Sequence, residues 1–404
     1  MLQRTVADLE KNYYDAEFHG INLDAREHEA EERIRNAKSY GEAFAAIAWT
    51  LDALNDSHTF FLPPPRPYNV ENGWEMTFVG EKCFVTAVKP GSDAEKKDMK
   101  PGDQVLSIEG FQPVRANFWK VEYILNALAP RAGMRFVLAS PGAQPRQVDV
   151  MAEVKRLKRV EDFTGHGDGS DIWETIRRSE NYAHTQEWRW IETSDDVMVL
   201  KIPSFFAKDS QIDSELGRAR KHKSLILDLR GNPGGSEDVL TQLLGGMFKQ
   251  DVTLATRVGR KARKPVIAKG RGDHAFDGKL MVLIDSHSAS CSELFARAVQ
   301  IENRGVIIGD KSAGAVMEAR LYPEHLGIDT MSFYAVQITA SNLLMGDGNS
   351  LEHSGVTPDV SVLPTAEDLA NDRDPQMAEA FKLVGIKITP EAAGKLFPVI
   401  WAMN

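Results

Sequence analysis

The stretch LILDLRGNPGG, residues 225–235, decides the fold of the second half of the chain. Four apolar residues around one aspartate form a short run typical of a buried strand, and the glycines and proline predict a tight turn where it ends. Further strand-like and helix-like runs alternate along the chain: 197–202, 238–248, 280–284, 292–301 and 305–309. Strands that alternate with helices predict a mainly parallel sheet with crossover helices, which is an α/β core.

A second stretch, DSHSASCSELFARA at 285–298, joins one of these strands to the following helix. The carboxyl ends of parallel strands meet at one edge of a sheet, so this stretch and the RGNPGG turn are expected to lie together. Serines at a helix start often serve only as caps. A serine hydroxyl also becomes a nucleophile when a base takes its proton. The serines therefore leave both interpretations open, and the base must be sought elsewhere.

We expect four regions along the 404 residues. Residues 1–66 show apolar side chains at helical spacing and end in three consecutive prolines. Residues 70–155 contain short β-like runs separated by glycine and proline turns. A charged, irregular connector follows at 156–194, and the α/β core at 195–404 ends in a predicted helix.

Composition excludes several classes of function. The net charge of −10 argues against nucleic acid as a partner, because phosphate binding needs a basic face. No apolar run reaches the roughly 18 residues that span a membrane, and the N-terminus lacks the pattern of a signal peptide. Cys83 and Cys291 lie in unrelated contexts, so we expect no disulfide. No metal-binding or phosphate-binding motif is found, so we expect no metal and no cofactor.

Four motifs resemble those of a known family. VKPGSDAEKKDMKPGDQVLSIEG at 88–110 resembles the PDZ domain, whose exposed strand edge binds extended peptides. SHSASCSE within 285–298 resembles the SASASE motif of the tail-specific, or C-terminal processing, serine peptidases. Residues 225–235 and VIIGDKSAGA at 306–315 resemble two further motifs of that family. The resemblance implies a PDZ-like β domain, a ClpP/crotonase-like core and a polypeptide substrate.

The resemblance also assigns the nucleophile and the donors that would stabilise the reaction. The middle serine of the motif is Ser290. Negative charge that develops on a substrate carbonyl oxygen needs preorganised donors, and glycines let the backbone approach the substrate closely. We therefore expect the N–H of Gly234 or Gly235, together with that of Cys291, to form the oxyanion hole.

The base is the point at which this sequence departs from the common family pattern. Members with a Ser–Lys dyad carry a lysine and a supporting glutamine after the fourth strand. Ala315 and Ala319 occupy those positions here, which argues against the dyad. Lys311 lies nearby and remains an alternative base.

A second branch, that of the tricorn core protease, uses a histidine base. LNDSHTFF at 54–61 and NSLEHSGVTPDV at 349–360 resemble its two segments. The resemblance implies that His58 takes the nucleophile's proton, that Glu352 orients the imidazole, and that Ser57 assists one of them.

Other interpretations stay open from the sequence. His287 is a rival base because it lies only three residues before the nucleophile. A catalytically inactive relative that binds peptides or apolar ligands would share the same fold. The resemblance suggests a compartment outside the cytoplasm, and the sequence leaves homo-oligomerisation open.

Overall fold

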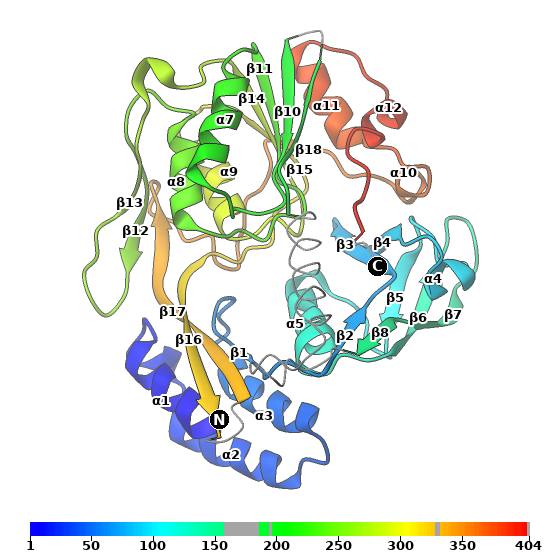
Figure 1. The fold of residues 1–404 in the computed structure, drawn as a ribbon, viewed down its shortest axis with the longest axis vertical. Coiled ribbons are helices and arrows are strands. Elements are labelled where there is room, and N and C mark those ends of the chain that lie inside the picture. Colours follow the sequence, from blue (N-terminus) through cyan, green and yellow to red (C-terminus); the bar gives the residue numbers. More distant parts are fainter. Residues whose placement is uncertain (157–185, 194–195, 328–331, 402–404) are drawn as a thin grey trace, which may run out of the picture.

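The computed structural model describes residues 1–156, 186–193, 196–327 and 332–401 (Figure 1). Most of the predicted connector 156–194 lies outside the described residues. Within the described ranges, N-terminal helices, a small antiparallel sheet and a larger α/β core are arranged around a central region where all three meet (Figure 1). The predicted fold class, a helical N-terminal region with a PDZ-like β domain and an α/β core, is confirmed.

A six-stranded sheet forms the α/β core, in the order β18-β15-β14-β11-β10-β9. Its strands are β9 (Arg189–Glu192), β10 (Val197–Lys201), β11 (Ser224–Asp228), β14 (Lys279–Ile284), β15 (Val306–Gly309) and β18 (Val360–Ser361). All neighbouring pairs are parallel except β9 with β10. The strands predicted from apolar runs are therefore present, and their carboxyl ends lie at one edge.

Helices cover both faces of this sheet (Figure 1). One face carries α7 (Asp209–Ala219), α8 (Glu237–Gly245) and α9 (Cys291–Ile301), and the other carries α11 (Pro375–Val384) and α12 (Pro390–Gly394). Side chains of one strand alternate between them: Met198 packs with α7–α9, and Val199 packs with α11. The single C-terminal helix predicted from sequence is wrong, because α10 (Ala366–Ala370), α11 and α12 are separate helices.

A second sheet connects the core to the N-terminal helices. Its order is β1-β17-β12-β13, with β16 paired to β17. The strands are β1 (Phe60–Leu62), β12 (Val252–Val258), β13 (Val266–Ala268), β16 (Met317–Leu326) and β17 (Ser332–Met345). A short 3-10 turn, η4 (Gly272–His274), follows β13. The long strands β16 and β17 run from the core to the helices, and the sequence analysis did not predict them (Figure 1).

The N-terminal helices pack against β17. They are α1 (Leu2–Asn12), α2 (Leu23–Asn36) and α3 (Tyr40–Asp52), with a 3-10 turn η1 (Phe18–Gly20) between the first two. Leu9, Leu51 and Phe61 are buried with Val336 and Ile338 of β17. Because β1 pairs with β17, residues 53–59 between α3 and β1 are carried towards the core.

The small sheet is antiparallel, in the order β3-β4-β5-β6-β7. It comprises β3 (Trp74–Val79), β4 (Lys82–Val88), β5 (Gln104–Ile108), β6 (Gly133–Ala139) and β7 (Arg146–Met151). The accompanying elements are α4 (Asp93–Lys96), η2 (Arg115–Asn117), α5 (Phe118–Tyr123), η3 (Ile124–Leu128) and the pair β2 (Tyr68–Glu71) with β8 (Glu153–Arg156). Strand β3 is an edge strand, which is the feature that peptide addition requires.

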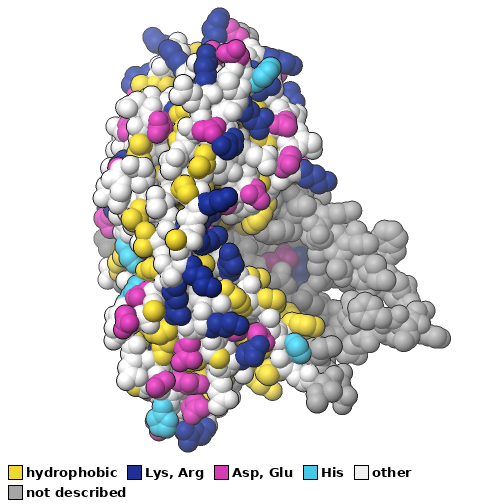
Figure 2. All heavy atoms as spheres, turned by 90° about the vertical axis from the view of Figure 1, so that its left-hand side faces the viewer, with side chains coloured by type: hydrophobic (Ala, Val, Ile, Leu, Met, Phe, Trp, Pro, Cys, Tyr) yellow, Lys and Arg dark blue, Asp and Glu magenta, His cyan; other side chains and the backbone are white. Residues whose placement is uncertain are grey.

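The side of the molecule that carries the β12–β13 hairpin shows Lys and Arg side chains in a band across its middle (Figure 2). In that hairpin, Arg257 pairs with Glu237 and with Glu318, at 3.0 Å from Glu318 Oε2. Arg263 also pairs with Glu318. Part of the positive charge of the hairpin is therefore neutralised within the chain.

Among the described helices, none is long and apolar enough to cross a membrane.

Candidate active site

Ser290 lies at the start of α9 in a strained backbone conformation. Its φ is 54° and its ψ is −115°. A positive φ is uncommon for a residue other than glycine, and it persists only where the surroundings hold it. The Ser290 N–H donates to the carbonyl oxygen of Ala315 at 2.9 Å and to Glu293 Oε2 at 3.0 Å. These two acceptors fix the backbone of the predicted nucleophile.

Glu293 is the buried support of this turn. Its carboxylate accepts hydrogen bonds from Ser290 N, Ser312 Oγ, Gly314 N and Ala315 N, at 2.6–3.0 Å. Burial raises the pKa of Glu293 to about 7, against the effect of these donors. The structure shows that Glu293 also ties the loop at 312–315 to the start of α9.

The RGNPGG turn packs directly against Ser290. A Cβ atom on Gly234, whose φ is 103°, would lie 2.7 Å from Ser290 Cβ, so no side chain fits there. The Gly234 N–H already donates to Asn232 Oδ1 at 2.8 Å.

Two backbone donors remain at this turn. The hydrogen bonds of the described residues provide no acceptor for the N–H of Gly235 or of Cys291. The two residues are neighbours, because Cys291 Sγ lies 3.4 Å from the Gly235 carbonyl oxygen. Of the glycines predicted for the oxyanion hole, Gly235 is the one whose N–H is still available.

Glu352, Ser57 and His58 form one hydrogen-bonded chain. Glu352 Oε1 accepts from Ser57 N at 2.9 Å, and Glu352 Oε2 accepts from Ser57 Oγ at 2.8 Å. Ser57 Oγ also lies 2.8 Å from His58 Nδ1. Since the hydroxyl proton is given to Glu352, the same oxygen can accept only from a protonated Nδ1. His58 Nε2 is then left as the free acceptor of the imidazole, as a general base requires.

Burial and charge act in opposite directions on His58. Burial lowers the pKa of His58, while the negative charges of Glu352 and Asp56 raise it. The neutral imidazole is therefore favoured at neutral pH, and the two carboxylates favour its protonated form when a proton arrives.

No hydrogen bond joins His58 to Ser290 in the described part of the chain. The two are connected through adjacent backbone groups: the Ala315 carbonyl holds Ser290, and the Val316 N–H donates to Glu352 Oε2 at 2.8 Å. In an unliganded enzyme, catalytic hydrogen bonds are often long and tighten only with substrate. The backbone of residues 315–316 thus contacts the predicted nucleophile Ser290 on one side and Glu352, which is linked to His58, on the other.

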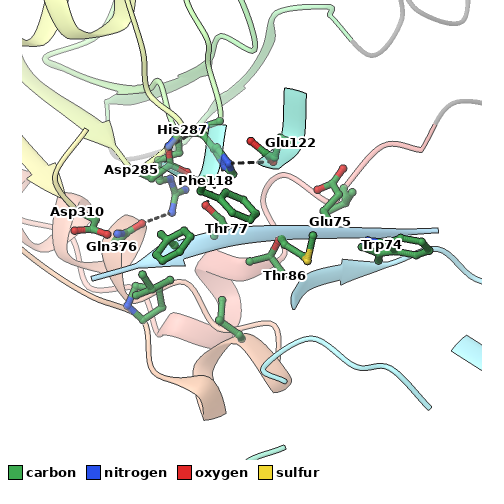
Figure 3. Close-up of a pocket in the computed structure, with 18 of the residues that line it drawn as sticks. Trp74, Glu75, Thr77, Thr86, Phe118, Glu122, Asp285, His287, Asp310 and Gln376 are labelled. Atoms are coloured by element: carbon green, nitrogen blue, oxygen red, sulfur yellow. Dashed lines mark hydrogen bonds and ion pairs between the residues drawn. The ribbon is translucent and has the colours of Figure 1, made fainter. Parts of the chain in front are cut away.

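The rival bases make other contacts. His287 Nδ1 lies 2.9 Å from Thr77 Oγ1, and its Nε2 lies 3.8 Å from Glu122 Oε1. It faces a cavity of about 630 Å³ between the small sheet and the core, together with Glu75 and Phe118 (Figure 3). The exposed Lys311 is held through its backbone by Asp310 and Arg115. Neither contacts Ser290 through a hydrogen bond or ion pair between described residues.

Two supporting residues escaped the sequence analysis, although both lie inside quoted motifs. Asp56 precedes His58 by two residues, and Asn232 lies in the RGNPGG turn. Each accepts from the N–H two residues further on, at 2.8 Å. Asp and Asn are known for this local bond, so the spacing itself could have identified them.

Comparisons with known proteins show which family the core is similar to. Residues 196–362, which contain Ser290 and Glu352, match the family model of Peptidase family S41. The core is therefore similar to Peptidase family S41. The N-terminal helices and the small sheet flank this core and lie outside the matched residues. Among the described residues, no group of three or more His, Cys, Asp or Glu could hold a metal.

Similar proteins are found among curated sequences and solved structures. The chain is 24% identical over 327 residues to "Tail-specific protease" of Haemophilus influenzae, covering 76% of this chain and 44% of that protein. It is 24% identical over 294 residues to "Carboxyl-terminal-processing protease" of a Picosynechococcus strain, covering 69% and 64%. The chain therefore spans about half to two thirds of the length of these relatives.

Two solved structures share the fold over nearly the whole chain. Mature CPAF complexed with lactacystin superposes with a TM-score of 0.64 at 14% identity, covering 91% of this chain and 95% of that one. The photosystem II D1 C-terminal processing protease gives a TM-score of 0.55 at 18% identity, covering 97% and 98%. At such identity these likenesses establish the architecture.

Proposed function

We propose that this chain is a serine endopeptidase that cleaves polypeptides through Ser290, His58 and Glu352. The observation that carries this proposal is the chain of hydrogen bonds from Glu352 through Ser57 to His58, which leaves His58 Nε2 free. The S41 core and the names of its relatives support the class of reaction. The positive φ of Ser290 and its close packing against Gly234 support the position of the chemistry.

In the proposed mechanism, Ser290 Oγ attacks the carbonyl carbon of the scissile peptide bond while His58 Nε2 takes its proton. Glu352 stabilises the resulting imidazolium through the Ser57 hydroxyl. The N–H groups of Gly235 and Cys291 stabilise the negative charge on the carbonyl oxygen. His58 then gives its proton to the leaving amine, which leaves an acyl group on Ser290. Water, deprotonated by His58, hydrolyses that ester and restores the hydroxyl.

The small sheet would serve as a PDZ-like module for the substrate. We propose that residues 70–155 form this module, that residues 1–66 form the N-terminal region and that the core begins at residue 195. The edge strand β3 of the module lies beside α5. The cavity of about 630 Å³ lies between these two elements and the core (Figure 3). An extended polypeptide could add to such an edge, with its side chains in the cavity.

A fluorophosphonate probe, read by mass spectrometry, tests the proposed nucleophile and base. We expect an adduct on Ser290 in the wild type and no adduct in Ser290→Ala. The His58→Ala variant should label at least about a hundredfold more slowly, which is the low end of what a general base contributes. The matched controls His287→Ala and Lys311→Ala should label at the wild-type rate.

Two outcomes would contradict the proposal. A wild-type protein that does not label would favour a relative that binds peptides or apolar ligands without cleaving them. Labelling that survives His58→Ala and is lost in Lys311→Ala would move the base to lysine.

A further inference from the structure

Asp56 is a buried carboxylate directly beside the predicted base. Its side chain is 5% exposed. Asp56 Oδ1 accepts from the backbone N–H of His58 at 2.8 Å and from Thr339 Oγ1 at 2.7 Å. Thr339 belongs to β17, so this carboxylate joins the turn that carries His58 to the second sheet.

The second oxygen of this carboxylate has no hydrogen-bond partner among the described residues. Asp56 Oδ2 is buried, and so is the equally unpartnered hydroxyl of Tyr13, at the end of α1. Burial and, after it, the charge of Asp56 raise the pKa of Tyr13, which places the phenol in the field of this carboxylate. A buried donor and a buried acceptor, each without another partner, thus lie close together behind the base.

No cationic side chain forms an ion pair with Asp56 in the described part of the chain. The titratable groups around it are Tyr13 and Tyr14 directly after α1, Asp15, His19 of η1, His58 itself, and Glu352 and His353 from the C-terminal segment. Asp56 and several of these residues, Glu352 among them, line a cavity of about 250 Å³. His19 and His353 are engaged elsewhere, by Tyr14 Oη and by the Asn55 carbonyl. The only cation that catalysis itself would create next to Asp56 is the imidazolium of His58.

The geometry points to Asp56 as a second carboxylate for the base, a positioning residue that holds the His58 backbone and stabilises the imidazolium by its charge. This inference rests on the proposed function and extends it. Glu352 acts on His58 through the Ser57 hydroxyl from the Nδ1 side. Asp56 acts through the backbone and through space, without a hydrogen bond to the ring. The division has a physical reason, because a buried imidazole accepts a proton only if nearby negative charge compensates for burial.

The test compares Asp56→Asn with wild type in two measurements on the full chain. Asparagine keeps an oxygen that can accept from His58 N and Thr339 Oγ1, and it removes the charge. A ¹³C-histidine NMR titration, with His58 assigned by His58→Gln, should show that the imidazole titrates at a lower pH in Asp56→Asn. The rate of fluorophosphonate labelling at Ser290 should fall roughly tenfold at its plateau, and its acid limb should move to lower pH.

The controls distinguish an effect of the Asp56 charge from an effect on folding. Asp15 lies in the same region, but its carboxylate accepts hydrogen bonds from Glu17 N and His19 N instead of His58 N. Asp15→Asn should therefore leave the His58 titration and the labelling rate unchanged. If Asp56→Asn fails to fold, Asp56→Ser replaces it, because a serine hydroxyl can also accept the His58 N–H.

An unchanged His58 titration in the neutral variant would overturn the inference. So would slower labelling without a shift of the acid limb, since that is what a purely structural role produces. A wild type that does not label at Ser290 would refute the proposed peptidase, while the NMR titration would still decide whether Asp56 acts on His58.

Discussion

At the scale of single residues, the site depends on one hydroxyl. The Ser57 hydroxyl donates a hydrogen bond to Glu352 and accepts one from His58 Nδ1, so the carboxylate is linked to the imidazole through this hydroxyl. Triads are usually described with a direct contact between acid and histidine. Here the intervening oxygen sets the tautomer of His58, the proposed base.

Replacing Ser57 by Ala should therefore slow labelling of Ser290 by roughly 10- to 100-fold, because the imidazole loses its orientation and its link to Glu352. The cost in stability should stay near 1–2 kcal/mol, since one partly buried hydroxyl is removed. Ser57→Thr keeps the hydroxyl and should restore most of the rate. A Ser57→Ala variant that labels Ser290 at the wild-type rate would show that the hydroxyl is dispensable.

We expect the titration of His58 to determine how labelling of Ser290 depends on pH. Burial lowers the pKa of His58 below the ordinary 6.5, so the neutral base persists to a lower pH than in a free histidine. Labelling should accordingly decline only below pH 6.5. The same shift makes folding pH-dependent: the stability contributed by His58 is present above 6.5 and is lost as pH falls through the folded pKa.

Denaturant titrations of wild type and His58→Gln between pH 5 and pH 8 would measure this effect. The difference in unfolding free energy between the two should change with pH only on the acid side of the range. A labelling profile whose midpoint lies above pH 6.5 would exclude a histidine whose pKa is lowered by burial.

At the scale of elements, the RGNPGG turn and the start of α9 must pack within van der Waals distance. Gly234 and Gly231 both have positive φ, of 103° and 74°. A Cβ at Gly234 would meet Ser290, whereas a Cβ at Gly231 would meet nothing within 4 Å. Substituting Gly231 therefore tests the cost of a positive φ alone, whereas substituting Gly234 also tests the close contact with Ser290.

Gly231→Ala should cost only the backbone term, about 1–2 kcal/mol, and should leave labelling of Ser290 within about threefold of wild type. Gly234→Ala adds a clash with Ser290 and should abolish labelling, with a larger loss of stability of about 2–4 kcal/mol. Labelling rates and denaturant unfolding of the two variants provide the comparison. If Gly234→Ala labels normally, the turn does not shape the site.

At the scale of the whole molecule, a largely buried ion pair attaches the small sheet to the core. Arg115 Nη1 lies 2.8 Å from Asp310 Oδ2, with side chains 14% and 10% exposed. Asp310 also accepts from Gly80 N at 2.9 Å, next to strand β3. This contact positions the small sheet beside the loop that leads into the 312–316 segment.

Arg115→Ala should leave Asp310 buried without its cation and cost about 3–5 kcal/mol. Hydrogen exchange should then increase at residues 77–80 and 310–312, where the two parts meet. Arg131→Ala is the control, because Arg131 is 55% exposed and pairs with Glu109 inside the small sheet. Its loss should cost less than about 1 kcal/mol. Unchanged exchange in Arg115→Ala would mean that other contacts hold the two parts together.

Elements with strong local signals can be predicted from the amino-acid sequence alone. The buried parallel strands follow from short apolar runs, and the turns at 231–235 and 285–290 follow from glycine, proline and serine at strand ends. The motif positions of Ser290, His58 and Glu352 could be named because they lie in quoted stretches, although their roles remain the proposal.

The remaining features depend on long-range packing. Strand β16 is mostly exposed or half-buried, and β17 contains runs of consecutive buried residues, so neither has the strict alternation typical of a half-buried strand. The N-terminal helices pack against β17 and bury part of it. The choice of Gly235 over Gly234 depends on where the Asn232 side chain turns. The charge environment of His58 depends on Glu352, which the tertiary structure brings from the C-terminal segment to the turn before β1. Contacts between residues far apart in the chain depend on burial and on the closure of long loops. Local sequence propensity does not predict them.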